Sequence, residues 1–320
     1  AVVLACLATG LIGSCFVASG LLGRYPVLGG QGLRYGVAAV VLGAAAARSR
    51  RGLAPLRRLP PRLYGRLALL AATGMVGFNA AVLAAERTAE PSVPGVLVGC
   101  APLVLALTVP LREGRRPSSR LAGSAVLVVA GAAVVQGFGR TDAAGLGWSG
   151  LALVGEVLFS LVAVPLIAAL GPVLLAAAAC AAGCVEALAA GLLLDGPGAL
   201  RLPSAAEAGA LAWLALPVTV LAFWWWYTAV DRLGPERAGL FSGLIPVAAA
   251  VTAPLLHLGV LGPAQFLGTA LDGAGVAAGL PRSGSRSRGR PRSRPRPRSR
   301  SRSDSASSTT AANVSAAPRY

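Results

Sequence analysis

The chain has 320 residues, of which 55% are hydrophobic, and its mean hydropathy is +0.68. Its formal charge of +17 comes from arginine and no lysine, and 11 arginines lie between Arg282 and Arg319. Since charge is confined to short blocks between long uncharged stretches, the composition argues against a soluble domain with an evenly polar surface and against a nucleic-acid partner.

Ten apolar stretches are long enough to cross a membrane as helices. About 20 apolar residues span ~30 Å of hydrocarbon, and a helix satisfies its own backbone groups there. The predicted spans are 1–22, 27–47, 66–86, 91–111, 118–138, 148–169, 172–194, 209–230, 237–257 and 260–280. The first could instead be a trimmed signal peptide, but nine further spans favour a membrane helix. We therefore predict an all-α polytopic membrane protein.

Arginines between the spans predict the orientation, because cytoplasmic loops carry an excess of positive residues. One predicted side carries Arg48, Arg50, Arg51, Arg57, Arg58, Arg62, Arg66, Arg112, Arg115, Arg116, Arg120, Arg232 and Arg237. The other side carries only Arg24, Arg87, Arg140 and Arg201. We expect both termini to be cytoplasmic, in the inner membrane of a bacterium.

Residues 281–320 are rich in Arg, Ser and Pro, and they predict a disordered cytoplasmic tail because nothing there can form a core. Attraction to anionic lipid headgroups would suit such a tail. The five cysteines all lie in apolar stretches without metal-type spacing, and we interpret them as small buried hydrophobic residues. We expect no metal and no cofactor.

An internal repeat organises the spans. Four residues recur at an offset of 144: Gly95, Gly99, Pro102 and Pro110 recur as Gly239, Gly243, Pro246 and Pro254. Gly131 and Gly275 keep the same offset. Because five spans separate the two copies, the second copy must be inverted relative to the first, as in many secondary transporters. The predicted halves are residues 1–138 and 148–280.

The repeated glycines and prolines predict helix packing and helix breaks. Gly95/Gly99 and Gly239/Gly243 have the i, i+4 spacing that lets two helices approach closely. Pro102 and Pro246 each remove a backbone donor in mid-membrane and free a carbonyl. Their recurrence in both halves supports paired helix breaks that shape a cavity or hinge, and simple packing with a harmless kink is the alternative.

Several segments resemble the EamA family of the drug/metabolite transporter superfamily. The resemblance covers nearly all of residues 1–280. It rests on three groups of residues: Pro26 with Gln31-Gly-Leu-Arg34-Tyr35; Gly99-Cys-Ala-Pro102, Leu111-Arg-Glu113, Gly123 and Gly131; and Tyr227, Asp231-Arg-Leu-Gly-Pro235, Pro246, Gln265 and Gly268. The resemblance implies ten helices, cytoplasmic termini and the movement of small metabolites or drugs, usually outward.

The chain departs from this family in two places. The family often has a glutamate in the short loops after spans 4 and 9, and Glu113 matches the first, whereas Leu258 lies near the second position. Asp272 lies within span 10, where the family is usually apolar.

Four polar residues predict a substrate cavity. Ionisable groups inside membranes are costly and are functional candidates by default. Counted at ~1.5 Å per residue, Arg34, Asn79, Glu156 and Glu186 lie about 10–12 Å from the same face, on four different spans. Arg34 would bind a substrate carboxylate or pair with a glutamate, and a glutamate could exchange a proton during transport. A structural ion pair between helices is the alternative.

Two other features are predicted to be interfacial. The run Trp224-Trp225-Trp226-Tyr227 is typical of an aromatic belt at the membrane surface, although one of its faces could line the pathway. His257 is a single histidine near the end of span 9.

We predict a secondary transporter that exports small organic metabolites or drugs by alternating access, with the lipid bilayer and a small-molecule substrate as partners. A homo-oligomer is compatible with the sequence. The chain has no Walker-type loop and no nucleophile elbow, and we do not expect an enzyme. The alternatives are a membrane-embedded enzyme acting on lipid-linked substrates, with Glu113 among its arginines, and a non-transporting scaffold whose basic tail recruits a partner.

Overall fold

The computed structural model describes residues 1–20, 22, 25–90, 92–137, 139–255 and 262–280. The described residues form helices and no strand, apart from one isolated bridge between Ala89 and Thr141. Residues 1–280 form one compact unit. The predicted tail at 281–320, His257 and Leu258 lie outside the described residues.

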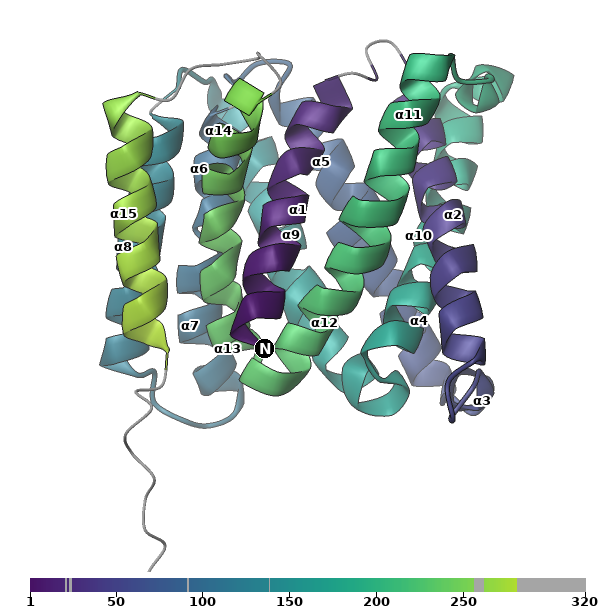
Figure 1. The fold of residues 1–320 in the computed structure, drawn as a ribbon, viewed down its shortest axis with the longest axis horizontal. Coiled ribbons are helices and arrows are strands. Elements are labelled where there is room, and N and C mark those ends of the chain that lie inside the picture. The colour runs from purple at the N-terminus through teal and green to yellow at the C-terminus, as the bar shows by residue number, and fades with distance from the viewer. Residues whose placement is uncertain (21, 23–24, 91, 138, 256–261, 281–320) are drawn as a thin grey trace, which may run out of the picture. The chain divides into compact units, whose positions relative to one another are not determined.

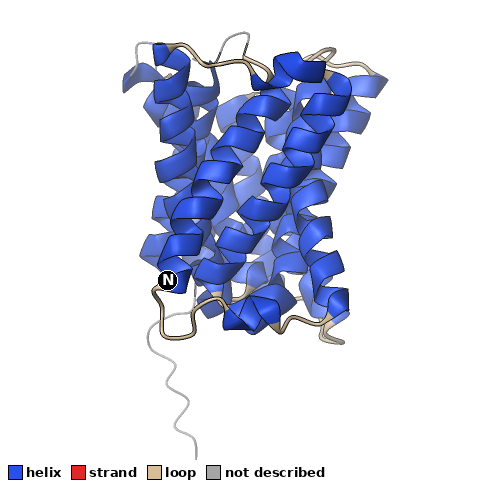
Figure 2. Ribbon diagram, turned by 90° about the vertical axis from the view of Figure 1, so that its right-hand side faces the viewer, coloured by secondary structure: helices blue, strands red, loops and turns tan. Residues whose placement is uncertain are grey.

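Seven helical stretches within the described residues are long and apolar enough to cross a membrane, which confirms an all-α polytopic membrane protein. They are α2 (Val27–Ala47); α4–η1–α5 (Pro61–Ala71, Ala72–Gly77, Phe78–Ala85); α6–α7 (Ser92–Gly99, Ala101–Arg112); α8 (Ser119–Gln136); α9 (Ala143–Leu170); α10 (Pro172–Leu194); and α11–η3–α12 (Ala205–Trp213, Leu214–Leu221, Ala222–Leu233). Figure 2 shows these helices running between two ends where the loops gather.

The remaining helices are not among these seven. They are α1 (Val2–Gly20), α3 (Ala54–Arg57), η2 (Gly196–Leu200), α13 (Pro235–Gly239), η4 (Leu240–Gly243), α14 (Leu244–Leu255) and α15 (Pro263–Gly279). The η2 and η4 segments are 3₁₀-helices, whereas η1 and η3 are π-helices. Figure 1 shows α1, α14, α15 and α8 in the same bundle as the longer helices.

Three helices begin earlier than predicted because local signals start them. Pro61 occupies the first turn of α4, where its fixed φ suits a helix and its missing N–H costs nothing. Asp142 caps α9 by accepting a 2.7 Å hydrogen bond from the Gly145 N–H. Ser204 and Glu207 form a capping box on α11. Arg66, predicted in a loop, therefore lies within α4.

Helix pairs that are distant in sequence make the most extensive contacts. The main pairs are α2 with α10, α8 with α15, α1 with α14 and α12, and α9 with α5 and α6. Hydrogen bonds and ion pairs identify the loops that share an end of the bundle. Tyr25 contacts Arg201 at what we call the Tyr25 end, and Arg115 contacts Glu236 at the opposite end, the Arg115 end.

The predicted packing glycines lie at close helix contacts. A Cβ on Gly95 would collide with Gln136 of α8, and one on Gly99 would lie 3.1 Å from Ala132. A Cβ on Gly239 would lie 2.7 Å from Leu105 of α7. One on Gly243 would overlap Val128 of α8. These contacts leave no room for larger side chains.

The helix interruptions lie just before Pro102 and its counterpart in the repeat, Pro246. The α6 helix ends at Gly99 and α7 resumes at Ala101, directly before Pro102. The η4 segment ends at Gly243, three residues before Pro246. Both prolines are buried. Each proline lacks the N–H that would complete the helical hydrogen bond across the interruption.

Candidate functional site: a polar cavity within the helical bundle

A cavity of about 550 Å³ lies among α1, α2, η1–α5, α9, α11–η3–α12 and α14. Its size is within the range of small-molecule sites, ~300–1,000 Å³. Three of the four predicted cavity residues line it: Arg34 from α2, Asn79 from α5 and Glu156 from α9. Tyr25 and Glu86 also line it, and both lie near helix ends at the Tyr25 end. The cavity therefore extends from the middle of the bundle toward that end.

Hydroxyl and amide groups hold Arg34 in place. Its Nε donates a 2.6 Å hydrogen bond to Oγ1 of Thr219, and its Nη1 donates to Oε1 of Gln31 at 3.4 Å. A weaker contact of 3.8 Å joins Nη1 to Sγ of Cys15. Among the described residues Arg34 forms no ion pair, and it is 6% exposed. The predicted pairing with a glutamate is therefore absent from this geometry, and the positive charge faces the cavity.

Asn79 extends this polar network across to α5. Its Oδ1 accepts from Nε2 of Gln31 at 3.2 Å, and its Nδ2 donates to the Met75 carbonyl at 2.7 Å. A longer 3.4 Å contact joins Nδ2 to the Tyr35 hydroxyl. Gln31 thus links Arg34 to Asn79, so that one chain of hydrogen bonds orders the polar wall.

Two π-helical segments contribute hydrogen-bond acceptors to this wall, one from the backbone and one from a side chain. The η1 segment carries Met75, whose carbonyl accepts from Asn79, and η3 carries Thr219, which receives Arg34. Thr219 also donates to the Leu214 carbonyl five residues earlier, at 2.7 Å. Pro217 lies inside η3, where it lacks a backbone donor and widens the turn. Such π-bulges often mark functional sites.

Glu156 adds a carboxyl group among aromatic side chains. It lines the same cavity as Phe78, Phe159 and Phe223. The Phe159 and Phe223 rings lie 5.5 Å apart between centroids. The site thus combines a buried cation, a carboxyl group and an apolar surface.

Glu186 does not line the cavity, contrary to the prediction. Its Oε2 is buried without a hydrogen-bond partner among the described residues, and the residue is partly exposed on α10. Gly183, on the same helix, packs against Met75 and Tyr35 instead. Depth along a helix gives the level of a residue but not its direction, and the prediction for Glu186 used depth alone.

The aromatic run is divided between two faces of α12. Trp226 is 4% exposed and lines the cavity, and Tyr227 is fully buried. Trp224 is 42% exposed, as expected for a residue facing lipid. The helical period of 3.6 residues separates neighbours in this way. The belt interpretation is therefore wrong for Trp226 and Tyr227.

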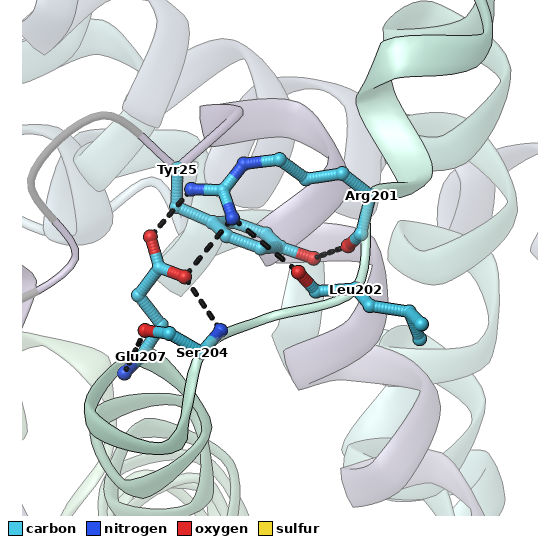
Figure 3. A network of polar contacts seen from close by, with 5 residues as sticks. All are labelled: Tyr25, Arg201, Leu202, Ser204 and Glu207. Carbon is cyan, nitrogen blue, oxygen red and sulfur yellow. Dashed lines mark hydrogen bonds and ion pairs between the residues drawn. The ribbon is translucent and has the colours of Figure 1, made fainter.

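A polar network, which we call the polar cover, lies at the Tyr25 end, where Tyr25 lines the cavity (Figure 3). The Arg201 guanidinium lies over the Tyr25 ring, 4.5 Å from its centroid, and the Tyr25 hydroxyl donates to the Arg201 carbonyl at 2.8 Å. Glu207 accepts from Arg201 at 2.5 Å and from the Ser204 N–H at 2.8 Å. Burial raises the pKa of the Tyr25 hydroxyl against the opposing charge of Arg201, so the hydroxyl remains a donor.

A second network lies at the Arg115 end. Arg115 follows α7 and contacts both Glu113 and Glu236, each at 2.5 Å. Glu236 lies on α13, in the other predicted half. The carboxylate of Glu113, considered for an enzyme site, is therefore used in an ion pair. Within the described residues no three His, Cys, Asp or Glu side chains gather as a metal site.

Sequence reasoning missed two elements of the site. Thr219 was not predicted as a partner of Arg34, although it lies two residues after Pro217 in an apolar span. The pairing of Tyr25 with Arg201 joins loops 176 residues apart and leaves no local signal.

The comparisons with known proteins concern the fold alone. No family model matches the chain, and no curated protein matches it. A solved structure described as "Crystal structure of protein" matches with a TM-score of 0.75 at 20% identity, covering 87% of this chain and 96% of that one. The fold and the cavity together define an all-α polytopic membrane protein with an internal cavity that has polar side chains in an apolar lining.

Proposed function

We propose that this chain is a secondary transporter of the EamA type, which exports small organic metabolites or drugs by alternating access. The observation that carries the proposal is the cavity, because a buried arginine and a carboxyl group line one space inside a membrane bundle. Such residues in membranes mark substrate or ion pathways. A small molecule with an acidic group, a basic group and an apolar body fits this chemistry.

The proposal includes ten spans in two inverted halves. Besides the seven long helices, α1, α13–η4–α14 and α15 would each cross the membrane. When each span is replaced by the span five positions away, the helix contacts correspond. The contact of α5 with α9 (spans 3 and 6) corresponds to that of α12 with α1 (spans 8 and 1), and the contact of α6 with α9 (spans 4 and 6) corresponds to that of α14 with α1 (spans 9 and 1). The π-helix at Ala72–Gly77, shifted by 144 residues, falls within Leu214–Leu221.

Helix direction supports the inversion. Gly29 near the start of α2 faces Ala199, just beyond the end of α10, so these two helices run in opposite directions. Gly268 near the start of α15 faces Val135 near the end of α8. Corresponding helices of the two proposed halves are thus antiparallel, as an inverted repeat requires.

We further propose that the Arg115 end is cytoplasmic. Arg115, Arg116 and Arg120 lie in or beside one loop at this end, together with the arginines that follow α2, whereas the described arginines at the other end are Arg87, Arg140 and Arg201. Positive residues concentrate in cytoplasmic loops. In alternating access, the networks of Tyr25 with Arg201 and of Arg115 with Glu236 would open in turn, because each joins the two halves.

The test is a metabolite export and resistance screen in cells that express the chain. We expect one or more small metabolites to leave wild-type cells faster than control cells. Arg34→Ala should lower this export at least about tenfold, since the charge that holds the substrate is lost. Arg87→Ala is the matched control, because Arg87 is exposed and does not line the cavity. Equal export by both variants would contradict the assigned site.

A further inference from the structure

Asp272 is a buried carboxyl group that the cavity does not use. It lies on α15, is 0% exposed, and neither carboxyl oxygen has a hydrogen-bond partner among the described residues. Thr269, one turn earlier on α15, is exposed and donates to its own helix. An ionised carboxylate held without a partner inside a membrane protein is strongly unfavourable. The position therefore requires a cation that no described residue supplies.

Two glycines form the slot that holds this carboxyl group. A Cβ on Gly131 of α8 would lie 2.8 Å from Cγ of Asp272, and a Cβ on Gly243 of η4 would lie 3.2 Å from Oδ1. Larger residues at either position would push the acid out. Both glycines also belong to the 144-residue repeat. The slot thus lies where α8, α15 and the helix interruption before α14 meet.

The chemistry around the slot favours a proton over a metal ion. Among the described residues, the elements that make the main contacts with α15 are α8, η4 and α14, and within these elements the titratable side chain is Arg120. Arg120 is exposed and donates to the carbonyls of Ala278 and Leu280 at the end of α15. The hydroxyls of Ser124 and Ser242 donate to their own helices. A metal ion needs several oxygen ligands, whereas a proton needs only the carboxylate.

The slot is connected to the cavity through the chain. Gly243, which touches Asp272, ends η4, and Ile245, two residues later, lines the cavity. A short 3₁₀ segment within a longer helix often marks a hinge. A change in the packing of Asp272 against Gly243 therefore acts on α14, which forms part of the cavity wall.

We propose that Asp272 is a proton-binding site that couples proton uptake and release to the opening of the cavity. The coupling rests on the transport function proposed above, whereas the proton site itself does not. A carboxylate oxygen takes a proton from water, and the neutral group fits between Gly131 and Gly243. When the proton returns to water, the charge must be hydrated, and α15 and η4 separate to admit that water.

Infrared spectroscopy of the purified full chain tests the proton site directly. We expect wild-type protein at neutral pH to show the carbonyl-stretch band of a protonated carboxyl group, with partial or complete loss of that band at high pH. Asp272→Asn should remove the Asp272 contribution completely. Thr269→Val, on the exposed face of the same helix, should leave it unchanged. A spectrum identical in wild type and Asp272→Asn would overturn the proton site.

Two further measurements check that the variant is folded and that the bound cation is a proton. Asp272→Asn keeps the shape of the side chain without charge, so its melting temperature should match that of wild type at neutral pH. At fixed pH, sodium should not change the wild-type melting temperature. A sodium-dependent rise that is absent from Asp272→Asn would show that the site binds sodium instead of a proton, and it would overturn the proposal.

The coupling is tested separately by export. Wild-type export should change with an imposed pH gradient, and Asp272→Asn should lose that dependence while still exporting down a substrate gradient. Export whose pH dependence survives in Asp272→Asn would overturn the coupling and leave the transporter intact. Absence of any wild-type export would contradict the transport function, while the infrared result would still decide the proton site.

Discussion

The two ends of the bundle are closed by different means. At the Tyr25 end, the contacts of Tyr25, Arg201 and Glu207 form a thin polar cover over the cavity. Toward the Arg115 end, the helices fill the interior with apolar side chains. These include Leu42, Leu67, Leu70, Leu166, Leu170, Leu175 and Val230. Since exposed ion pairs stabilise little and buried packing stabilises much, the Tyr25 end should open more readily.

The largest contrast should appear in stability. Leu166 is fully buried, and Leu166→Ala should lower the free energy of unfolding by about 2–5 kcal/mol, because a cavity replaces packed atoms. Leu202, beside the polar cover, is 90% exposed, and Leu202→Ala should change the free energy of unfolding by less than about 0.5 kcal/mol. Denaturation in detergent measures both. Similar losses at the two positions would remove the contrast between the ends.

A smaller effect is expected from opening the polar cover. Arg201→Ala removes both the contact with the Tyr25 ring and the ion pair with Glu207. The Cys15 thiol lines the cavity, so it should react several-fold faster with a water-soluble thiol reagent in this variant. Peptide mapping by mass spectrometry measures the rate at Cys15.

Arg140→Ala is the control for this variant, because Arg140 pairs with Glu90 at the surface and does not line the cavity. It should leave the Cys15 rate unchanged. If Arg201→Ala and Arg140→Ala accelerate the reaction equally, the cover does not limit access to the cavity.

The smallest effect concerns the Asp142 cap, which starts α9. The hydrogen bond from the Gly145 N–H lowers the pKa of Asp142, so the ionised group is favoured in the folded protein. Its stabilisation is therefore present above the unfolded pKa of about 3.9 and is lost as the pH falls through the lower folded value. Asp142→Ala should lower the melting temperature slightly at pH 7 and progressively less in acid. A deficit that grows in acid would contradict this sign.

The helices were largely predictable because apolar length is a local property. The predicted span 172–194 coincides with α10, and 27–47 coincides with α2. The early start of α9 also has a local cause, the Asp142 cap, but hydropathy alone does not detect a cap.

The site was predictable only in part. Depth correctly placed Arg34 and Glu156 at one level, and both line the cavity. The direction of Glu186 depends on how α10 is rotated against its neighbours. That rotation follows from close contacts such as Gly32 against Leu188, which join distant segments. Packing of this kind leaves no periodic signal in the sequence.

Access to Cys15 from each side of the membrane tests the central claim most directly. The measurement uses sealed vesicles of both orientations, the chain with its other four cysteines replaced by alanine, and a membrane-impermeant thiol reagent. Alternating access predicts that Cys15 reacts from both sides, faster from the side of the Tyr25 end. Reaction from one side only, even after Arg201→Ala and prolonged exposure, would contradict the account.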